Sequence, residues 1–191
     1  ILGLLLCPSA QGTMYLQDSI NYTASTQLGA NTPWASPYAQ VTVASGGLLY
    51  SGLSDLSPAG NMVASAGATG GGATYRTFDT TATSGTVYFS FLFRCTAAPG
   101  SSGYYIMGLL PSSTTTPGGR TADPIVLMAK SATGGFNLGV GSANAALADY
   151  GSTVLTANTT NLVVLKYDMG SKVASLYLNP SPGGTEPGTP D

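Results

Sequence analysis

The sequence predicts an all-β protein, an antiparallel sandwich of two packed sheets, from three observations. First, about ten short β-prone runs follow one another with mostly short turns between them, which favours antiparallel pairing. Second, 26 Gly and 12 Pro punctuate the chain of 191 residues, a length that usually forms one domain. Third, only 7% of the residues are charged, while 11 Tyr and 5 Phe are available to fill a core.

The expected strands are short, and most alternate between apolar and mixed positions. They cover residues 38–44, 47–53, 62–66, 73–79, 85–96, 104–110, 125–130, 136–140, 162–168 and 173–179. The run 85–96 has the strongest pattern, because successive side chains of a strand point to opposite faces. One face carries Val87, Phe89, Phe91, Phe93 and Cys95, and the other carries Tyr88, Ser90, Leu92 and Arg94. A strand with these two faces suits the middle of a sandwich sheet.

Turn residues predict which strands pair. We expect 85–96 to pair with 104–110 through the turn at 99–103, and 162–168 to pair with 173–179 through 169–172. Residues 133–135 join the runs 125–130 and 136–140. The best helical candidate, residues 144–148, is about one turn long, which is too short to be stable alone. Residues 180–191 contain four prolines and are expected to form a loop.

The first residues are typical of a truncated export signal. Residues 1–7 are apolar but too short to span a bilayer, and Ala10 and Gly12 place small residues at −3 and −1 of a cleavage site. We therefore expect a signal peptide over 1–12, one domain over 13–191, and a location outside the cell or on its surface. The alternative is that residues 1–7 form a buried strand.

Charge and residue counts exclude several classes of function. The net charge is −2 and the six basic residues form no patch, so the sequence predicts neither nucleic-acid binding nor membrane insertion of the mature domain. The chain has no His, and Cys95 is the one cysteine outside residues 1–12. Zinc sites and His-based triads are therefore not expected, and Cys95 is interpreted as a small buried hydrophobe.

A set of short motifs spread over residues 14–191 is moderately specific when taken together. The motifs are Asp18-Ser19-Ile20-Asn21-Tyr22, Leu28-Gly29, Trp34, residues 48–53, Gly60-Asn61, Arg76-Thr77-Phe78, residues 87–92, 136–141, 162–167 and 176–180, and Glu186-Pro187. They resemble a family of exported bacterial proteins. The resemblance implies a concanavalin A-like, laminin-G-like jelly roll, often ahead of a C-terminal Pro-Glu-Pro sorting anchor. Members usually continue past the Glu-Pro loop, so C-terminal strands are expected to be missing.

Glycoside hydrolysis is the first enzymatic activity to weigh, because sandwiches of this type include glucanases. That chemistry needs two carboxylates facing the scissile bond. The single glutamate, Glu186, lies in the terminal loop, and no two aspartates lie two or four apart on one expected strand. We therefore predict no enzyme, no catalytic residues and no cofactor. Calcium stays an open alternative at Asp123, Asn137 and Asp149, although these residues form no spaced ligand motif.

Three aromatic residues are the candidate ligand-binding residues. Trp34 follows Pro33, and Tyr104 and Tyr105 begin a strand after a glycine-rich loop, so each could stack on a sugar. The alternative places Trp34 at the edge of the core. The sequence thus favours a non-catalytic extracellular module that binds carbohydrate or adheres, with a polysaccharide or cell-surface polymer as partner. The alternatives are a structural surface protein without a small ligand and, last, a glycoside hydrolase.

Overall fold

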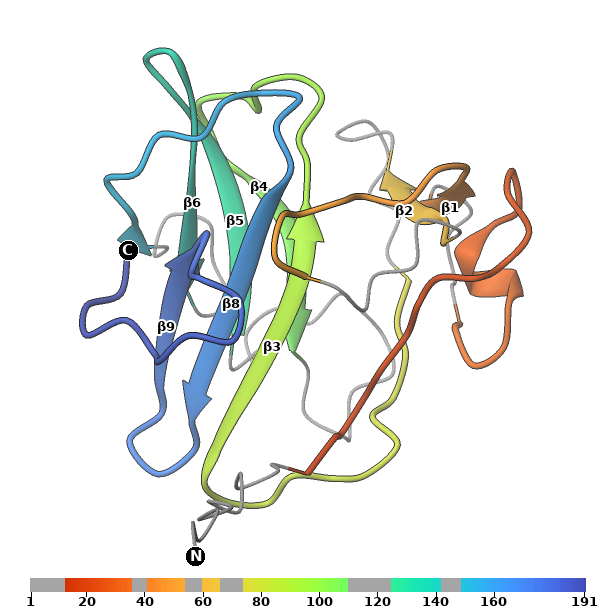
Figure 1. Ribbon diagram of the computed structural model, residues 1–191, viewed down its shortest axis with the longest axis horizontal. Coiled ribbons are helices and arrows are strands. Elements are labelled where there is room, and N and C mark those ends of the chain that lie inside the picture. The colour runs from red at the N-terminus through yellow and green to blue at the C-terminus, as the bar shows by residue number, and fades with distance from the viewer. Residues whose placement is uncertain (1–12, 36–40, 54–59, 66–73, 110–124, 142–148) are drawn as a thin grey trace, which may run out of the picture.

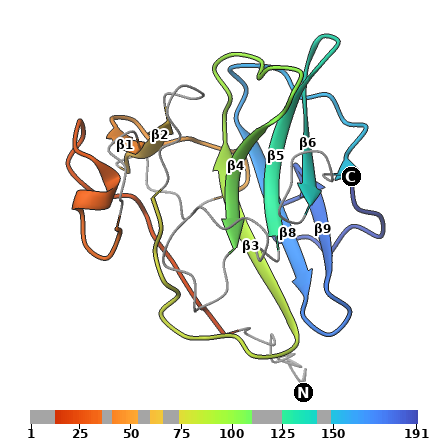
Figure 2. The same ribbon diagram turned by 180° about the vertical axis from the view of Figure 1, so that it is seen from behind.

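The computed structural model is all-β, with antiparallel sheets of two, three and four strands. It describes residues 13–35, 41–53, 60–65, 74–109, 125–141 and 149–191. The three-stranded sheet lies in front of the four-stranded sheet in Figure 1, and Figure 2 shows the reverse order from behind. The one helical element in these ranges is a 3-10 turn, η1, at Leu28–Ala30.

The strands are short, as the sequence predicts. Their bounds are β1 Val41–Ala44, β2 Met62–Ser65, β3 Thr86–Phe93, β4 Tyr104–Leu109, β5 Ile125–Ala132, β6 Gly135–Gly141, β7 Asp149–Tyr150, β8 Asn161–Asp168 and β9 Val173–Leu178. The sheet orders are β1-β2, β3-β8-β9 and β4-β5-β6-β7. Every pairing between these strands is antiparallel.

One hydrophobic cluster draws side chains from both of the larger sheets. Its fully buried members include Phe136 and Leu138 of β6 and Val163 of β8. The expected inner face of β3 supplies Phe89, Phe91 and Phe93, and Cys95 packs against the same cluster. Burying a side chain of this size stabilises the fold by about 1.5–3 kcal/mol. The alternation predicted for residues 85–96 is therefore confirmed over Thr86–Phe93, but the expected position in the middle of a sheet is wrong, because β3 is the edge strand of the described β3-β8-β9 sheet.

Two predicted hairpins are present. β5 pairs with β6 through Thr133 and Gly134, and Gly134 has a φ of 85° that favours glycine. β8 pairs with β9 through the four-residue turn at 169–172. Within that turn, the Asp168 carboxylate accepts hydrogen bonds from the backbone N–H and the hydroxyl of Ser171. Both predicted hairpins are therefore confirmed.

The predicted pairing of 85–96 with 104–110 is wrong. β3 pairs with β8 over eight residues, from Thr86 with Asp168 to Phe93 with Asn161, whereas β4 pairs with β5. The glycine-rich segment 99–103 is therefore a connection between two sheets. Its Gly100 carbonyl accepts hydrogen bonds from the N–H groups of Gly103 and Ser131, which fastens the segment to β5. Turn residues at 99–103 indicate where the chain changes direction, but they do not specify which strand the next one pairs with.

Two other expected strands are not strands. Residues 47–53 form an irregular segment with a turn at 51–52, where Gly52 has a φ of 87°. In the described part of 73–79, a single bridge joins Tyr75 to Ala35. Apolar residues alone suggested strands there, but backbone partners decide whether an apolar run becomes one. Conversely, β7 was not predicted from its two residues.

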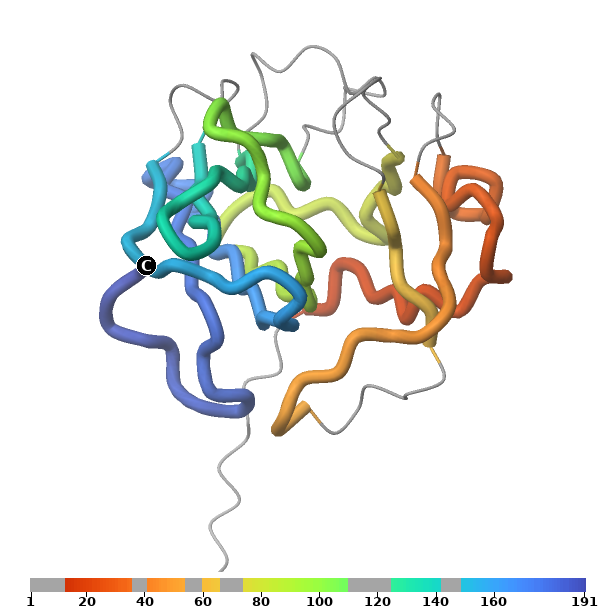
Figure 3. Tube along the Cα trace, turned by 90° about the horizontal axis from the view of Figure 1, so that it is seen from above, coloured from red at the N-terminus to blue at the C-terminus, as the bar shows by residue number. Residues whose placement is uncertain are grey.

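A second, smaller core lies beside η1 and the β1-β2 sheet. Leu28, Val41 and Val43 are buried, with Ile20, Tyr22 and Trp34 packed against them. Figure 3 shows the N-terminal segments, red to orange, on the side away from the C-terminal strands, blue. The predicted signal peptide 1–12, the helical candidate 144–148 and Asp123 lie outside the described residues.

Candidate functional site

The outer face of the three-stranded sheet carries a row of polar side chains. Tyr88 of β3 is opposite Lys166 of β8, which is opposite Ser175 of β9. Ser90 and Tyr177 lie one row further, on either side of Val164. Directly opposite residues in a sheet share a face, so these side chains point away from the core.

The Glu186 carboxylate binds three of these side chains. Its Oε1 accepts hydrogen bonds from Lys166 Nζ and from the Tyr177 hydroxyl, both at 2.6 Å. Its Oε2 accepts one from the Tyr88 hydroxyl at 2.7 Å. Lys166 Nζ also lies 5.8 Å from the centroid of the Tyr88 ring. We call Tyr88, Lys166 and Tyr177 the donor triad; its members come from three neighbouring strands and meet on one carboxylate.

The triad keeps Glu186 ionised over a wide pH range. Three hydrogen bonds lower the pKa of Glu186 from 4.5 to about 2. The bond from Lys166 has the largest effect on the pKa, followed by those from Tyr177 and Tyr88. The same bond to Glu186 raises the pKa of the Lys166 ammonium, because it favours the charged form. The hydrogen bonds to Glu186 also raise the pKa of both tyrosines, so they stay protonated donors.

A small pocket lies further along β3, around Ser90, Phe91 and Leu92. Its volume is about 170 Å³, and its lining residues are Leu53, Ser90, Phe91, Leu92 and Leu162. Leu53 comes from the irregular segment after β1, whose Gly52 lies against the Pro182 ring of the C-terminal loop. Ser90 supplies the polar side chain of an otherwise apolar lining. The face therefore combines an apolar hollow with a hydrogen-bonding cluster.

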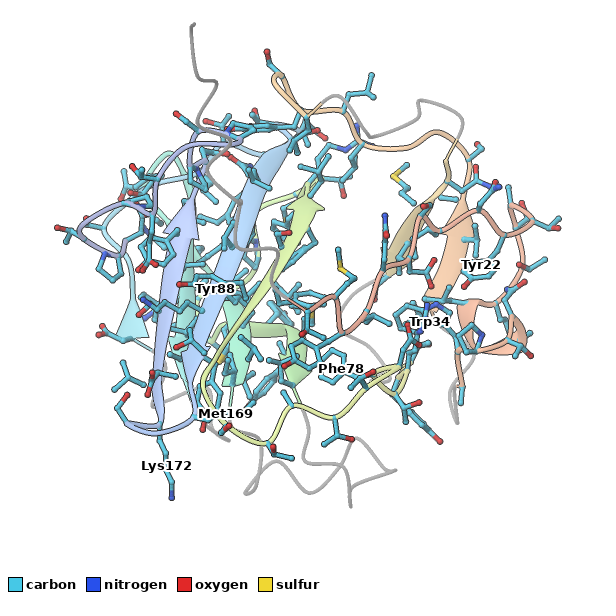
Figure 4. All side chains as sticks on the ribbon, turned by 60° about the horizontal axis from the view of Figure 1, so that its bottom comes forward. Tyr22, Trp34, Phe78, Tyr88, Met169 and Lys172 are labelled. Carbon is cyan, nitrogen blue, oxygen red and sulfur yellow. The ribbon has the colours of Figure 1, made fainter. Side chains whose placement is uncertain are left out.

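Tyr88 is the aromatic side chain that this face presents to solvent. It is 54% exposed, whereas Tyr177 is 5% exposed although it points to the same side. Figure 4 shows Tyr88 on the three-stranded sheet, apart from Trp34, which lies beside Tyr22. Sequence reasoning missed the triad. The sequence feature that could have pointed to it is that Tyr88 and Lys166 each stand between two core residues of their strand, which places them on the outer face.

Trp34 takes part in a second carboxylate cluster. Asp18 Oδ2 accepts hydrogen bonds from Trp34 Nε1 at 2.7 Å, Tyr22 Oη at 2.8 Å and Arg76 Nη1 at 2.7 Å. Asp18 Oδ1 accepts the backbone N–H of Ile20 at 2.8 Å. Burial alone would raise the pKa of Asp18, but these four hydrogen bonds lower it. The indole N–H is thus engaged inside the molecule.

Tyr104 and Tyr105 lie on β4 in the four-stranded sheet, so the structure does not bring them to Trp34. Tyr104 is 42% exposed, and its ring lies close to the backbone of Gly100. Tyr105 is half-buried opposite Met128 of β5. Of the predicted binding residues, Tyr104 is therefore the one with an exposed aromatic ring.

Among the residues with described positions, no group of three or more His, Cys, Asp or Glu side chains converges as metal ligands would. The Asn137 amide donates to the carbonyls of Gly151 and Thr153, both at 2.9 Å, and so fastens the segment after β7 to β6. Asp149 is exposed on β7. In the described ranges, no helix has the length and apolar character needed to cross a membrane.

Comparisons with known proteins found no match to the chain. No family model matches the chain, and neither a curated protein nor a solved structure is similar enough to count as a match. What the chain does must therefore be inferred from its own residues.

Proposed function

We propose that the chain is a non-catalytic extracellular module that binds carbohydrate or a similar surface polymer. The observation that carries the proposal is the exposed ring of Tyr88 beside Lys166 and Glu186, on a face fixed by three paired strands. Saccharide sites commonly combine an aromatic face with a few well-placed polar groups. Ser90, which lines the neighbouring pocket, adds a hydroxyl.

The finer fold and the cellular location belong to the same proposal. We infer a concanavalin A-like jelly-roll sandwich, supported by one core cluster that takes side chains from both larger sheets. The resemblance to exported bacterial proteins and the apolar residues 1–7 support secretion or display at the cell surface. Fold alone does not give an activity, so the test must address binding directly.

A glycan array probed with the chain and its variants tests the proposal. Tyr88→Ala should abolish specific binding, whereas Tyr88→Phe, which keeps the ring, should retain part of it. Trp34→Ala, Tyr104→Ala and Tyr105→Ala test the residues that the sequence singled out. Val173→Ala is the matched control, because Val173 is 55% exposed on β9 outside the triad. Absence of binding by folded protein to every glycan and cell-wall polymer would refute the proposal.

The second candidate is a structural surface protein without a small ligand. The observation that favours it is that the carboxylates of Asp18 and Glu186 already accept their hydrogen bonds from within the chain. A passive coat protein would show no glycan binding, and Tyr88→Ala would change nothing in a cell-adhesion assay. Adhesion lost in that variant would exclude the structural candidate.

A further inference from the structure

The donor triad has the form of a receptor for a carboxylate. One ammonium group and two phenol hydroxyls, each from a different strand, converge on the two oxygens of Glu186. Hydrogen bonds from charged donors to a carboxylate are the strong ones, and the paired strands hold these donors in place. By contrast, the carboxylate comes from a loop, so the receptor and its present occupant belong to separate parts of the fold.

The C-terminal loop, residues 180–191, is attached by few and superficial contacts. Between residues 181 and 191, only the side chain of Pro182 is half-buried, and every other one is exposed. Apart from Glu186, the loop is tied at Asp191. Its N–H donates to the Leu176 carbonyl, and its carboxylate accepts hydrogen bonds from the Leu178 N–H and the Thr153 hydroxyl. A segment whose own side chains are mostly exposed can open locally while the sheets stay folded.

Removal of Glu186 from the triad would leave a cationic site beside an aromatic ring. Lys166 would lose its ion pair, which the structure places at 2.6 Å, and the Tyr88 and Tyr177 hydroxyls would lose their acceptor. The exposed Tyr88 ring offers a surface on which a pyranose can stack. A ligand that satisfies all of these groups carries one carboxylate on a sugar ring.

We propose that the donor triad binds a uronic acid residue of an acidic saccharide, and that Glu186 occupies the same site as an internal competitor. The inference rests on the proposed function and names its ligand class. The uronate carboxylate would take the hydrogen bonds of Lys166, Tyr88 and Tyr177, and the loop would move aside. An acidic peptide carries the same carboxylate chemistry, but it lacks the ring that the Tyr88 surface accommodates.

Removing the competitor tests the inference. Glu186→Ala should tighten binding of oligogalacturonate by about tenfold or more, as expected if the closed loop occupies the site at least nine-tenths of the time. The fully methyl-esterified oligomer, which has the same ring without the charge, should show no such gain. Adding Lys166→Gln should reverse the gain by about tenfold, as for loss of a charged hydrogen bond. Lys172→Gln, in the exposed β8–β9 turn and pointing away in Figure 4, is the matched control.

Different results separate this inference from the proposed function. Equal gain for the charged and esterified oligomers, or a Lys166→Gln change without effect, would overturn the carboxylate site while leaving saccharide binding intact. If no oligosaccharide binds, monomeric glucuronate is titrated while the tyrosine NMR signals of the Glu186→Ala variant are followed. Shifts that Lys166→Gln removes would support the carboxylate site with a single sugar acid, and absence of shifts would overturn the site. Tighter binding of oligoglutamate than of oligogalacturonate would overturn the saccharide assignment.

Discussion

The clusters around Asp18 and Glu186 use nearly the same chemistry at different depths. Each carboxylate accepts hydrogen bonds of 2.6–2.8 Å from a cationic side chain and from aromatic donors. Asp18 and Arg76 have side chains only 11% and 10% exposed, whereas those of Glu186 and Lys166 are 37% and 28% exposed. Water can replace the partners of the second cluster but hardly those of the first.

The difference assigns the two clusters different roles. Asp18 joins segments that are 16 and 58 residues apart through Trp34 and Arg76, next to the small core of Leu28, Val41 and Val43. Arg76 Nε is buried without a hydrogen-bond partner, so this guanidinium depends on Asp18 all the more. The Asp18 cluster therefore stabilises the fold, while the Glu186 cluster is placed to exchange its carboxylate for another.

Asp18→Asn should produce the largest effect. It removes the negative charge from a nearly buried pair and leaves Arg76 without compensation, which should lower the free energy of unfolding by about 3 kcal/mol. Urea denaturation at pH 7 measures the change. Asp79→Asn is the control, because Asp79 binds the same Arg76 at 3.1 Å but is 63% exposed, and it should cost less than about 1 kcal/mol.

The pH dependence of the same variant gives an independent check. The pKa of Asp18 is lowered in the folded protein, so its contribution is complete above the ordinary value of 3.8 and is lost as pH falls through the lower folded value. The wild-type advantage over Asp18→Asn should therefore shrink below about pH 4. An advantage that stays constant down to pH 2 would contradict the assigned role of the Asp18 charge.

Trp34→Phe should have an intermediate effect. The change keeps an aromatic ring but removes the indole N–H that donates to Asp18 at 2.7 Å, and a hydrogen bond to a charged group contributes about 1.5–3 kcal/mol. Urea denaturation should show a loss near the lower figure, because Asp18 keeps three other donors. A loss of saccharide binding without a loss of stability would instead return Trp34 to the ligand site.

The sequence could predict the strands that carry their own pattern. Alternation in residues 85–96 and the glycine turn at 134 determine which face is buried and where the chain reverses, and both are local properties. The partner of β3 is not local, because β8 begins at Asn161, far beyond the glycine-rich segment 99–103 that suggested a hairpin. Local turn residues do not specify a partner so distant in the sequence.

The candidate site escaped prediction for a related reason. Tyr88, Lys166 and Tyr177 are unremarkable in the chain, and they converge only because β8 lies between β3 and β9. Glu186 was recognised as the sole glutamate, but a loop gives no indication of which face it will cover. The sequence identifies the aromatic residues, but which side chains they contact depends on the order of the strands in the sheet.

The titration of Glu186 should show the smallest effect on stability and the clearest one on charge. The carboxyl carbon signal of Glu186 should titrate with a midpoint of about 2 in the wild type. Lys166→Gln removes the largest cause of that depression, so the midpoint should rise toward the ordinary value of 4.5. Because the pKa is lowered on folding, the bonds that close the loop are complete above pH 4.5 and are lost as pH falls toward 2.

The urea midpoint at pH 7 should stay the same in Lys166→Gln, since the pair is exposed. If it fell as far as in Asp18→Asn, the two clusters would share one structural role, and Glu186 would not be a displaceable occupant of the triad.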